Sequence, residues 1–244
     1  MTSHPSHPST PCPAAPPPSG AGGARAALLI LADGRFPAGG HAHSGGAEEA
    51  IASGRLRDTD DLAEFCRGRL HTAGLTAAGL AAAAADGWDL RELDEAADAR
   101  TPSPALRAVA RRLGRQLIRA ARTVWPDPRL DALAAAAPRG AHQPVVLGLT
   151  ARVAGLGPGD AAYCAGYETV GAPVSAAVRL LGLDPFAATA VLARLAPDLD
   201  RVAARATAAV REGGGPAALP AASAPLLDIT AEQHAARPLR LFAS

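Results

Sequence analysis

Apolar residues recur at helical spacing along most of this chain, and no segment alternates between apolar and polar residues as a strand would. The apolar stripes predict about nine or ten helices and no internal repeat. Several predicted helices open with an N-cap residue followed by proline, as Ser103-Pro104 and Asp127-Pro128 do. The clearest stripe consists of Leu106, Val109, Leu113, Leu117 and Val124.

Changes in composition divide the chain into four parts. Residues 1–24 are rich in Pro, Ser, Ala, Gly and His, which predicts a disordered or polyproline-like tail. Residues 25–212 carry the helical pattern and are expected to form one all-helical domain. Residues 213–225 predict a flexible linker, and residues 226–244 an apolar and basic docking tail tethered by it.

Two local features bear on the helix boundaries. Residues 58–61 are expected to start a helix that runs to about residue 85, and Asp61 with Glu64 three residues later resembles a capping box there. Pro173 lies inside the apolar pattern that opens at Pro158, so this helix is expected to kink or split at that point.

Composition strengthens the helical prediction. Hydrophobic residues make up 48% of the chain and are mostly alanine, while aromatic residues make up only 3%. Alanine has the highest helix propensity, and strand-favouring residues are scarce. The expected fold class is therefore all-α, with closely packed helices.

Charge and targeting signals exclude several classes of protein. The formal net charge is +1, which gives no electrostatic case for binding nucleic acid or an anionic membrane. No stretch is apolar over the length of a membrane span, and the N-terminus lacks the pattern of a secretory signal. The three cysteines are too widely spaced to predict a disulfide framework. We expect a cytoplasmic protein.

The densest special chemistry lies in residues 37–48, called the signature segment below. It contains four glycines with His41, His43 and Ser44 between them. The segment is not a Walker phosphate loop, because the chain contains no lysine. It also lacks the Gly-x-Ser-x-Gly pattern of a nucleophile elbow, and no cofactor motif is present elsewhere. We therefore expect no enzymatic activity and no tightly bound cofactor.

The signature segment resembles that of the urease accessory protein F family (UreF), which reads Pro-x-Gly-Gly-aromatic-Ser-Tyr-Ser-x-Gly-Leu-Glu. Ser175 to Leu180 is similar to the family's central helix motif, and the end of the chain is similar to the family's Asp-Ile, His and Arg-Leu-Phe-x-Ser ending. His41 and His43 depart from the family's aromatic and Tyr. The matching residues are Pro37, Gly39, Gly40, Ser44, Gly46, Glu48, Arg179, His234, Arg240, Leu241 and Phe242.

The resemblance implies a function in loading nickel into apo-urease. It implies docking to accessory protein D (also called H), to the GTPase accessory protein G and to apo-urease, with coupling of GTP hydrolysis to nickel insertion. It also implies a homodimer. The matching residues named above are the expected partner surfaces. We expect Arg179 to pair with a carboxylate if it is buried, with Glu48 and Glu168 as candidates.

Nickel binding by the chain itself is the alternative. His41 and His43 could place two imidazoles on one ion, and Ni²⁺ accepts imidazole. His4, His7 and Cys12 in the N-terminal tail could add weak ligands. Under this alternative the protein is a nickel-holding metallochaperone. Otherwise these histidines serve in packing or hydrogen bonding, and Ni²⁺ is contacted at most transiently.

Overall fold

The computed structural model describes residues 21–39, 43–238 and 241–242. Over these residues the chain forms twelve α-helices and no β-strand, which confirms the all-α prediction. The helices are α1 (Ala21–Ala32), α2 (Ala47–Ala52), α3 (Thr59–Arg69), α4 (Leu75–Asp86), α5 (Leu90–Ala99), α6 (Pro104–Val124), α7 (Pro128–Ala136), α8 (Gln143–Val153), α9 (Pro158–Leu181), α10 (Pro185–Arg194), α11 (Ala196–Glu212) and α12 (Pro225–Ala235). A π-helical turn, η2 (Leu70–Gly74), joins α3 to α4, and a 3₁₀ turn, η3 (Pro216–Ala218), follows α11.

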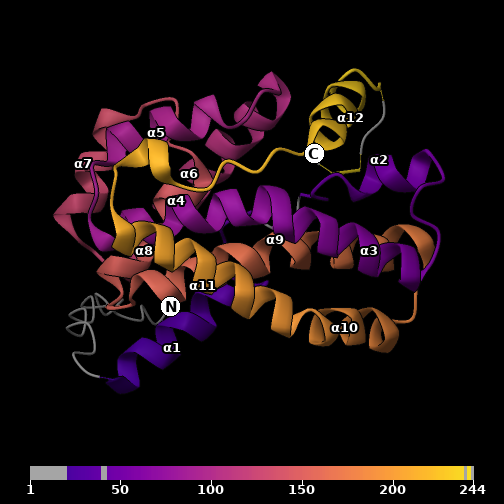
Figure 1. Cartoon of the computed structure of the whole chain (residues 1–244), viewed down its shortest axis with the longest axis horizontal. Coiled ribbons are helices and arrows are strands. Elements are labelled where there is room, and N and C mark those ends of the chain that lie inside the picture. Colours follow the sequence, from indigo (N-terminus) through magenta and orange to yellow (C-terminus); the bar gives the residue numbers. More distant parts are fainter. Residues whose placement is uncertain (1–20, 40–42, 239–240, 243–244) are drawn as a thin grey trace, which may run out of the picture.

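Helix α4 lies at the centre of the molecule and packs against α8, α9 and α11 (Figure 1). Ten of its twelve residues are buried, most of them alanine. Because alanine and glycine side chains are so small, the axes of α4 and α8 come very close. A Cβ atom added to Gly148 of α8 would lie 2.2 Å from the Ala81 carbonyl oxygen of α4.

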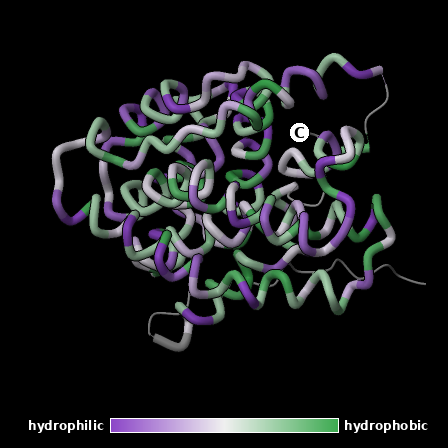
Figure 2. Tube along the Cα trace, turned by 45° about the vertical axis from the view of Figure 1, so that its right-hand side comes forward, coloured by the Kyte–Doolittle hydropathy of each residue, from purple (hydrophilic) through white to green (hydrophobic). Residues whose placement is uncertain are grey.

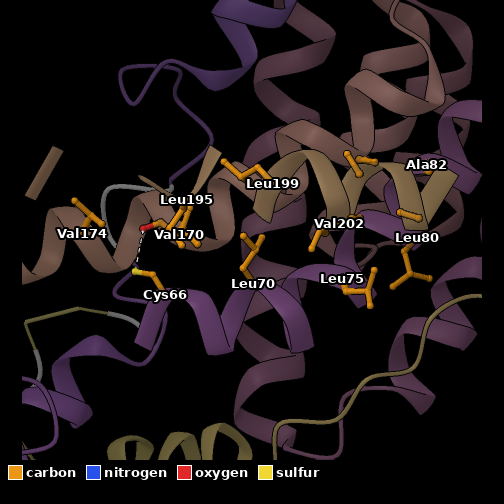
Figure 3. Packing of buried hydrophobic residues seen from close by; sticks show 14 of the residues in the cluster. Cys66, Leu70, Leu75, Leu80, Ala82, Val170, Val174, Leu195, Leu199 and Val202 are labelled. Atoms are coloured by element: carbon orange, nitrogen blue, oxygen red, sulfur yellow. Dashed lines mark hydrogen bonds between the residues drawn. The ribbon is translucent and has the colours of Figure 1, made fainter. Parts of the chain in front are cut away.

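The larger buried side chains fill the space around this centre. One cluster of these side chains lies between α9, α11 and the continuous stretch formed by α3, η2 and α4 (Figure 3). It includes Leu70, Leu75, Leu199 and Val202. The thiol of Cys66 lies in the same core, so it behaves as the small apolar group expected from its position. Both hydrophilic and hydrophobic residues occur along each outer helix, consistent with amphipathic helices (Figure 2).

Most predicted helix starts are confirmed. The Ser103 hydroxyl accepts a hydrogen bond from the Leu106 N–H, and Asp127 caps α7 in the same way. The start of α3 lies within the predicted residues 58–61, but the capping box predicted at Asp61 is wrong. Asp58 caps this helix by accepting from the Asp60 and Asp61 N–H groups, and Asp61 instead binds Arg57.

Pro173 does not split α9, which continues to Leu181. Proline cannot donate to the carbonyl four residues earlier, and this leaves the Thr169 oxygen without its helical partner. The Arg69 Nε donates to that oxygen at 3.0 Å. A side chain from a neighbouring helix thus replaces the missing hydrogen bond, and the helix passes through the proline.

Residues 213–224, expected to be a flexible linker, are held against the domain. Leu219 is buried, and the Arg100 guanidinium at the end of α5 donates to the carbonyls of Pro216, Leu219 and Pro220 at 2.7, 3.1 and 3.1 Å. The tail beyond this segment contains α12, a helix that the sequence pattern did not predict. It packs on α2 and α6 (Figure 1).

Replacing Arg100 with alanine is expected to release residues 213–224. Four carbonyl groups, those of residues 216, 217, 219 and 220, lose a charged donor, which weakens the local attachment by roughly 2 kcal/mol. Limited proteolysis should then cut this segment about 30-fold faster. Arg91→Ala is the matched control, since Arg91 lies on the exposed face of the same helix and pairs only with Glu95. Equal cleavage of both variants would contradict the assignment.

Among the described residues, no helix combines the length and the apolar character that a membrane crossing requires.

Candidate functional site

The carboxylate of Glu48 joins the signature segment to the end of the chain. Its Oε1 accepts a hydrogen bond from the Leu241 N–H at 2.8 Å, and its Oε2 accepts from the Phe242 N–H at 3.0 Å. The His234 Nε2 lies 2.8 Å from the same Oε2. Burial opposes ionisation of this carboxyl, but the three hydrogen bonds outweigh it and hold its pKa below the usual value.

Two further contacts hold the C-terminal residues in place. The buried Glu49 carboxylate forms an ion pair with Arg237, and the Arg179 guanidinium of α9 lies 4.8 Å from the centre of the Phe242 ring. Five residues chosen from the sequence therefore meet in one place, which we call the C-terminal cluster. They are Glu48, Arg179, His234, Leu241 and Phe242.

The ion pair expected for Arg179 applied only to a buried residue, and this condition is not met. Arg179 is exposed, and none of the described carboxylates pairs with it, because its partner is the Phe242 ring. Glu48 is occupied by the C-terminal residues, and Glu168 binds Gln143.

The glycines of the signature segment allow close packing. Gly45 has φ of +61°, a conformation that favours glycine, and a Cβ there would lie 3.0 Å from Pro173. Gly46 packs near Leu227 of α12. At Gly39 a Cβ would overlap the Gln116 side chain of α6. These glycines therefore hold the segment against three different helices.

The remaining predicted residues have different environments. Pro37 is exposed. Ser44 is completely buried, and its hydroxyl has no hydrogen-bond partner among the described residues. Gly40, His41 and Arg240 lie outside the described residues, so their proposed contacts stay predictions.

A cavity of about 560 Å³ lies beneath the signature segment. Its lining includes His43, Arg69, Glu168 and Arg179, together with apolar residues from α1, α4 and α6. The Gln143 side chain donates to the Glu168 carboxylate. Burial raises the pKa of Glu168 to about 7, against the effect of this hydrogen bond.

His43 is neutral in this environment. Its Nδ1 accepts a hydrogen bond from the Gly45 N–H at 2.7 Å, so the proton of the neutral ring is on Nε2. Burial, followed by the charges of Arg69 and Arg112, lowers its pKa to about 3. The structure thus places His43 in the packing and hydrogen-bonding arrangement that was one of its two expected uses.

No group of three or more His, Cys, Asp or Glu side chains within the described ranges is arranged to hold a metal ion. Cys66 and Cys164 are free and buried, and burial raises the pKa of both thiols to about 12. Cys12 and His41 lie outside the ranges that this statement covers.

Comparison with known proteins identifies the family. The UreF family model matches residues 56–196. A protein of Mycobacterium sp. (strain JLS) named urease accessory protein UreF is 45% identical over 218 residues, which cover 89% of this chain and 97% of that protein. The chain belongs to the UreF family. The proteins of the same name from Mycolicibacterium vanbaalenii and Mycobacterium tuberculosis (strain H37Rv) are 42% and 41% identical, over 90% of this chain and 98% of their own length.

Two residues of this UreF-family site, Arg69 and Arg237, were not selected from the sequence, and Glu168 was selected only as a possible partner of Arg179. Arg69 and Glu168 lie within apolar helical patterns, where a charged residue gives no signal of the cavity that it faces. Arg237 precedes a proline near the chain end and pairs with Glu49 across the fold. The sequence holds a clue to the use of Arg69 alone. Pro173 has no N–H for the Thr169 carbonyl, so a donor from elsewhere in the chain is required.

His43 and Glu168 are expected to give opposite pH dependences of stability. Unfolded histidine binds its proton near pH 6.5, whereas His43 in the folded protein does so only near pH 3. Acidification from pH 6.5 to 4.5 therefore favours unfolding through this group. Glu168 behaves in the opposite sense, because the folded carboxyl keeps its proton up to about pH 7 and the unfolded carboxyl loses it near pH 4.5.

Urea denaturation of two variants at several pH values tests this prediction. Relative to the wild type, His43→Gln should gain stability as the pH falls from 6.5 to 4.5. Glu168→Gln should gain stability as the pH rises from 4.5 to 7. Each difference is at most about 1.4 kcal/mol per pH unit. Parallel pH profiles for the wild type and both variants would contradict the burial of these groups.

Proposed function

We propose that this chain is a non-catalytic assembly factor for urease. In this proposal it docks accessory protein D (or H) and the GTPase accessory protein G onto apo-urease, and helps to couple GTP hydrolysis to nickel insertion. The observation that carries the proposal is the similarity to urease accessory protein UreF over 89% of this chain and 97% of that relative. The proposed location is the cytoplasm.

The chemistry of the C-terminal cluster supports a binding function. Glu48, the last residue of the signature segment, and the adjacent Glu49 are both engaged in holding the C-terminal residues. The hydroxyl of the buried Ser44 has no hydrogen-bond partner among the described residues, so none of them acts on it as a base. These groups are arranged to fix a surface rather than to transform a substrate.

The C-terminal residues present apolar side chains to solvent. Leu226 and Ile229 are 56% and 57% exposed on the outer side of α12, and Leu241 is 78% exposed. Exposed apolar groups next to one another favour contact with another protein. We propose that accessory protein D covers this surface.

Homodimer formation is a separate part of the proposal. Phe186 at the start of α10 is 86% exposed, which is unusual for an aromatic side chain. It lies on a different helix from the surface assigned to accessory protein D. A dimer contact at α10 would leave that surface open.

Nickel is proposed as cargo of the assembly, contacted by this chain at most transiently. Nickel titration by calorimetry tests the alternative, a metallochaperone using His41 and His43. Stoichiometric binding that is lost in the His41→Ala/His43→Ala variant would favour the alternative.

Size-exclusion chromatography with light scattering tests the assembly proposal. The chain is measured alone, with accessory protein D, and with both D and the GTPase. We expect a dimer alone and a stable complex that is lost on deletion of residues 237–244. Absence of a complex in every nucleotide and nickel state would refute the proposal.

A further inference from the structure

Arg69 lies in an unusual position at the junction of α3 and the π-helical turn η2. π-helical turns often occur at functional sites. Its Nε is used by the Thr169 carbonyl, and the rest of the guanidinium lines the cavity. The signature segment packs directly over it, because a Cβ on Gly45 would lie 3.2 Å from the Arg69 Nε.

No Asp or Glu carboxylate of the described residues neutralises this guanidinium, and the carboxylate of Ser244 lies outside them. Among the described residues, no Asp or Glu side chain lies within ion-pair distance of Arg69, although fourteen other ion pairs are present. The residues outside the described ranges contain no Asp or Glu at all. Burial lowers the pKa of Arg69 to about 10, but the group stays charged near neutral pH. Arg69 is partly buried, and an uncompensated charge in such a place is costly, so a counter-ion is expected.

The surroundings of Arg69 add further positive potential. Arg112 and His234 are close enough to disfavour protonation of His43. The His43 ring itself offers an N–H donor at Nε2, since its Nδ1 is occupied by the Gly45 N–H. The cavity therefore combines a cation, a neutral N–H donor and enough volume for a small ligand.

Glu168 lines the same cavity but forms no ion pair with Arg69. Burial raises the pKa of its carboxyl to about 7, against the hydrogen bond from Gln143. Below about pH 7 this carboxyl is protonated, and a protonated carboxyl does not repel an anion.

We propose that Arg69 and His43 form a binding site for a small oxyanion of the carboxylate or phosphate type, in the cavity beneath the signature segment. The guanidinium would pair with two oxygens of the ligand, the geometry for which arginine is best suited. The His43 Nε2–H would donate to one of them. This site is independent of the proposed function, because the isolated chain binds the ligand without partners.

Thermal unfolding with added anions tests the site. Sodium phosphate, sulfate and acetate are compared with sodium chloride at equal ionic strength. At about 100 times its dissociation constant, a bound anion should raise Tm by roughly 5 to 10 °C. Arg205→Gln is the control, because Arg205 is exposed on α11 and forms no ion pair among the described residues. It should respond as the wild type does.

Arg69→Gln should abolish the response, but it also removes the donor to the Thr169 carbonyl. The double variant Arg69→Gln/Pro173→Ala corrects this, because an alanine in place of the proline supplies the ordinary helical N–H. The single variant Pro173→Ala keeps Arg69 and should still bind the anion. His43→Phe should weaken binding about tenfold.

Three outcomes overturn the proposal. One is the absence of any anion-specific rise in Tm for the wild type. Another is an equal rise in the wild type and the double variant. The third is a wild type that shows no anion response, together with a double variant Arg69→Gln/Pro173→Ala that binds a partner more weakly. This result would mean that Arg69 pairs with an acidic side chain of that partner instead.

Discussion

Gly148→Ala is expected to lower the free energy of unfolding by about 3 kcal/mol, although alanine is the better helix former. The added Cβ would meet the Ala81 carbonyl oxygen at 2.2 Å and the Ala84 Cβ at 2.6 Å. Neither atom belongs to a flexible side chain that could turn aside. Helices α4 and α8 must therefore separate, which loosens the centre of the core.

Gly68→Ala is the matched control for this prediction. Gly68 also lies inside a helix, α3, but a Cβ there meets nothing within 4 Å. It should raise stability by about 0.5 to 1 kcal/mol through helix propensity alone. Thermal and urea denaturation of the two variants measure the difference, and Tm should fall by about 5 to 10 °C for Gly148→Ala. Similar values for both would mean that α4 and α8 are not in contact.

Glu48→Ala is expected to detach the C-terminal residues. The carboxylate accepts from two backbone N–H groups and contacts the His234 ring, so its loss weakens the local attachment by about 3 kcal/mol. The amide hydrogens of Leu241 and Phe242 should then exchange about 100-fold faster. Hydrogen exchange followed by mass spectrometry measures this directly.

The same variant connects stability with assembly. If the C-terminal residues form the docking surface for accessory protein D, Glu48→Ala should weaken that complex with little change in global Tm. Glu64→Ala is the control, since Glu64 is exposed on α3 and pairs only with Arg67. Unchanged exchange at Leu241 would show that Glu48 does not hold the chain end.

Local signals in the sequence predicted the helices well. Caps such as Ser103-Pro104 depend on neighbouring residues only, and they are visible in the sequence. The capping box at Asp61 was wrong, because Asp58 and Asp61 are equally plausible caps of α3 by residue type. Helix α12 was missed because its apolar spacing is weak, and it is held by long-range contacts to the start of α6.

Contacts between distant segments could be predicted only in part. The family resemblance selected Glu48, His234 and Phe242, but it did not reveal that they touch one another. The contact of Arg179 with Phe242 was not predicted, because the sequence does not show that Arg179 is exposed beside this ring. Arg69 was overlooked, since its use depends on a carbonyl 100 residues further along the chain.

The way Glu48 holds the end of the chain has a consequence for evolution and for engineering. Its two hydrogen bonds go to main-chain N–H groups, which every residue except proline provides. For this attachment alone, the identity of residue 241 is free to change, while the number of residues between His234 and Phe242 is not. An insertion or deletion in this interval would displace the attachment, and a change of side chain at Leu241 would leave it intact.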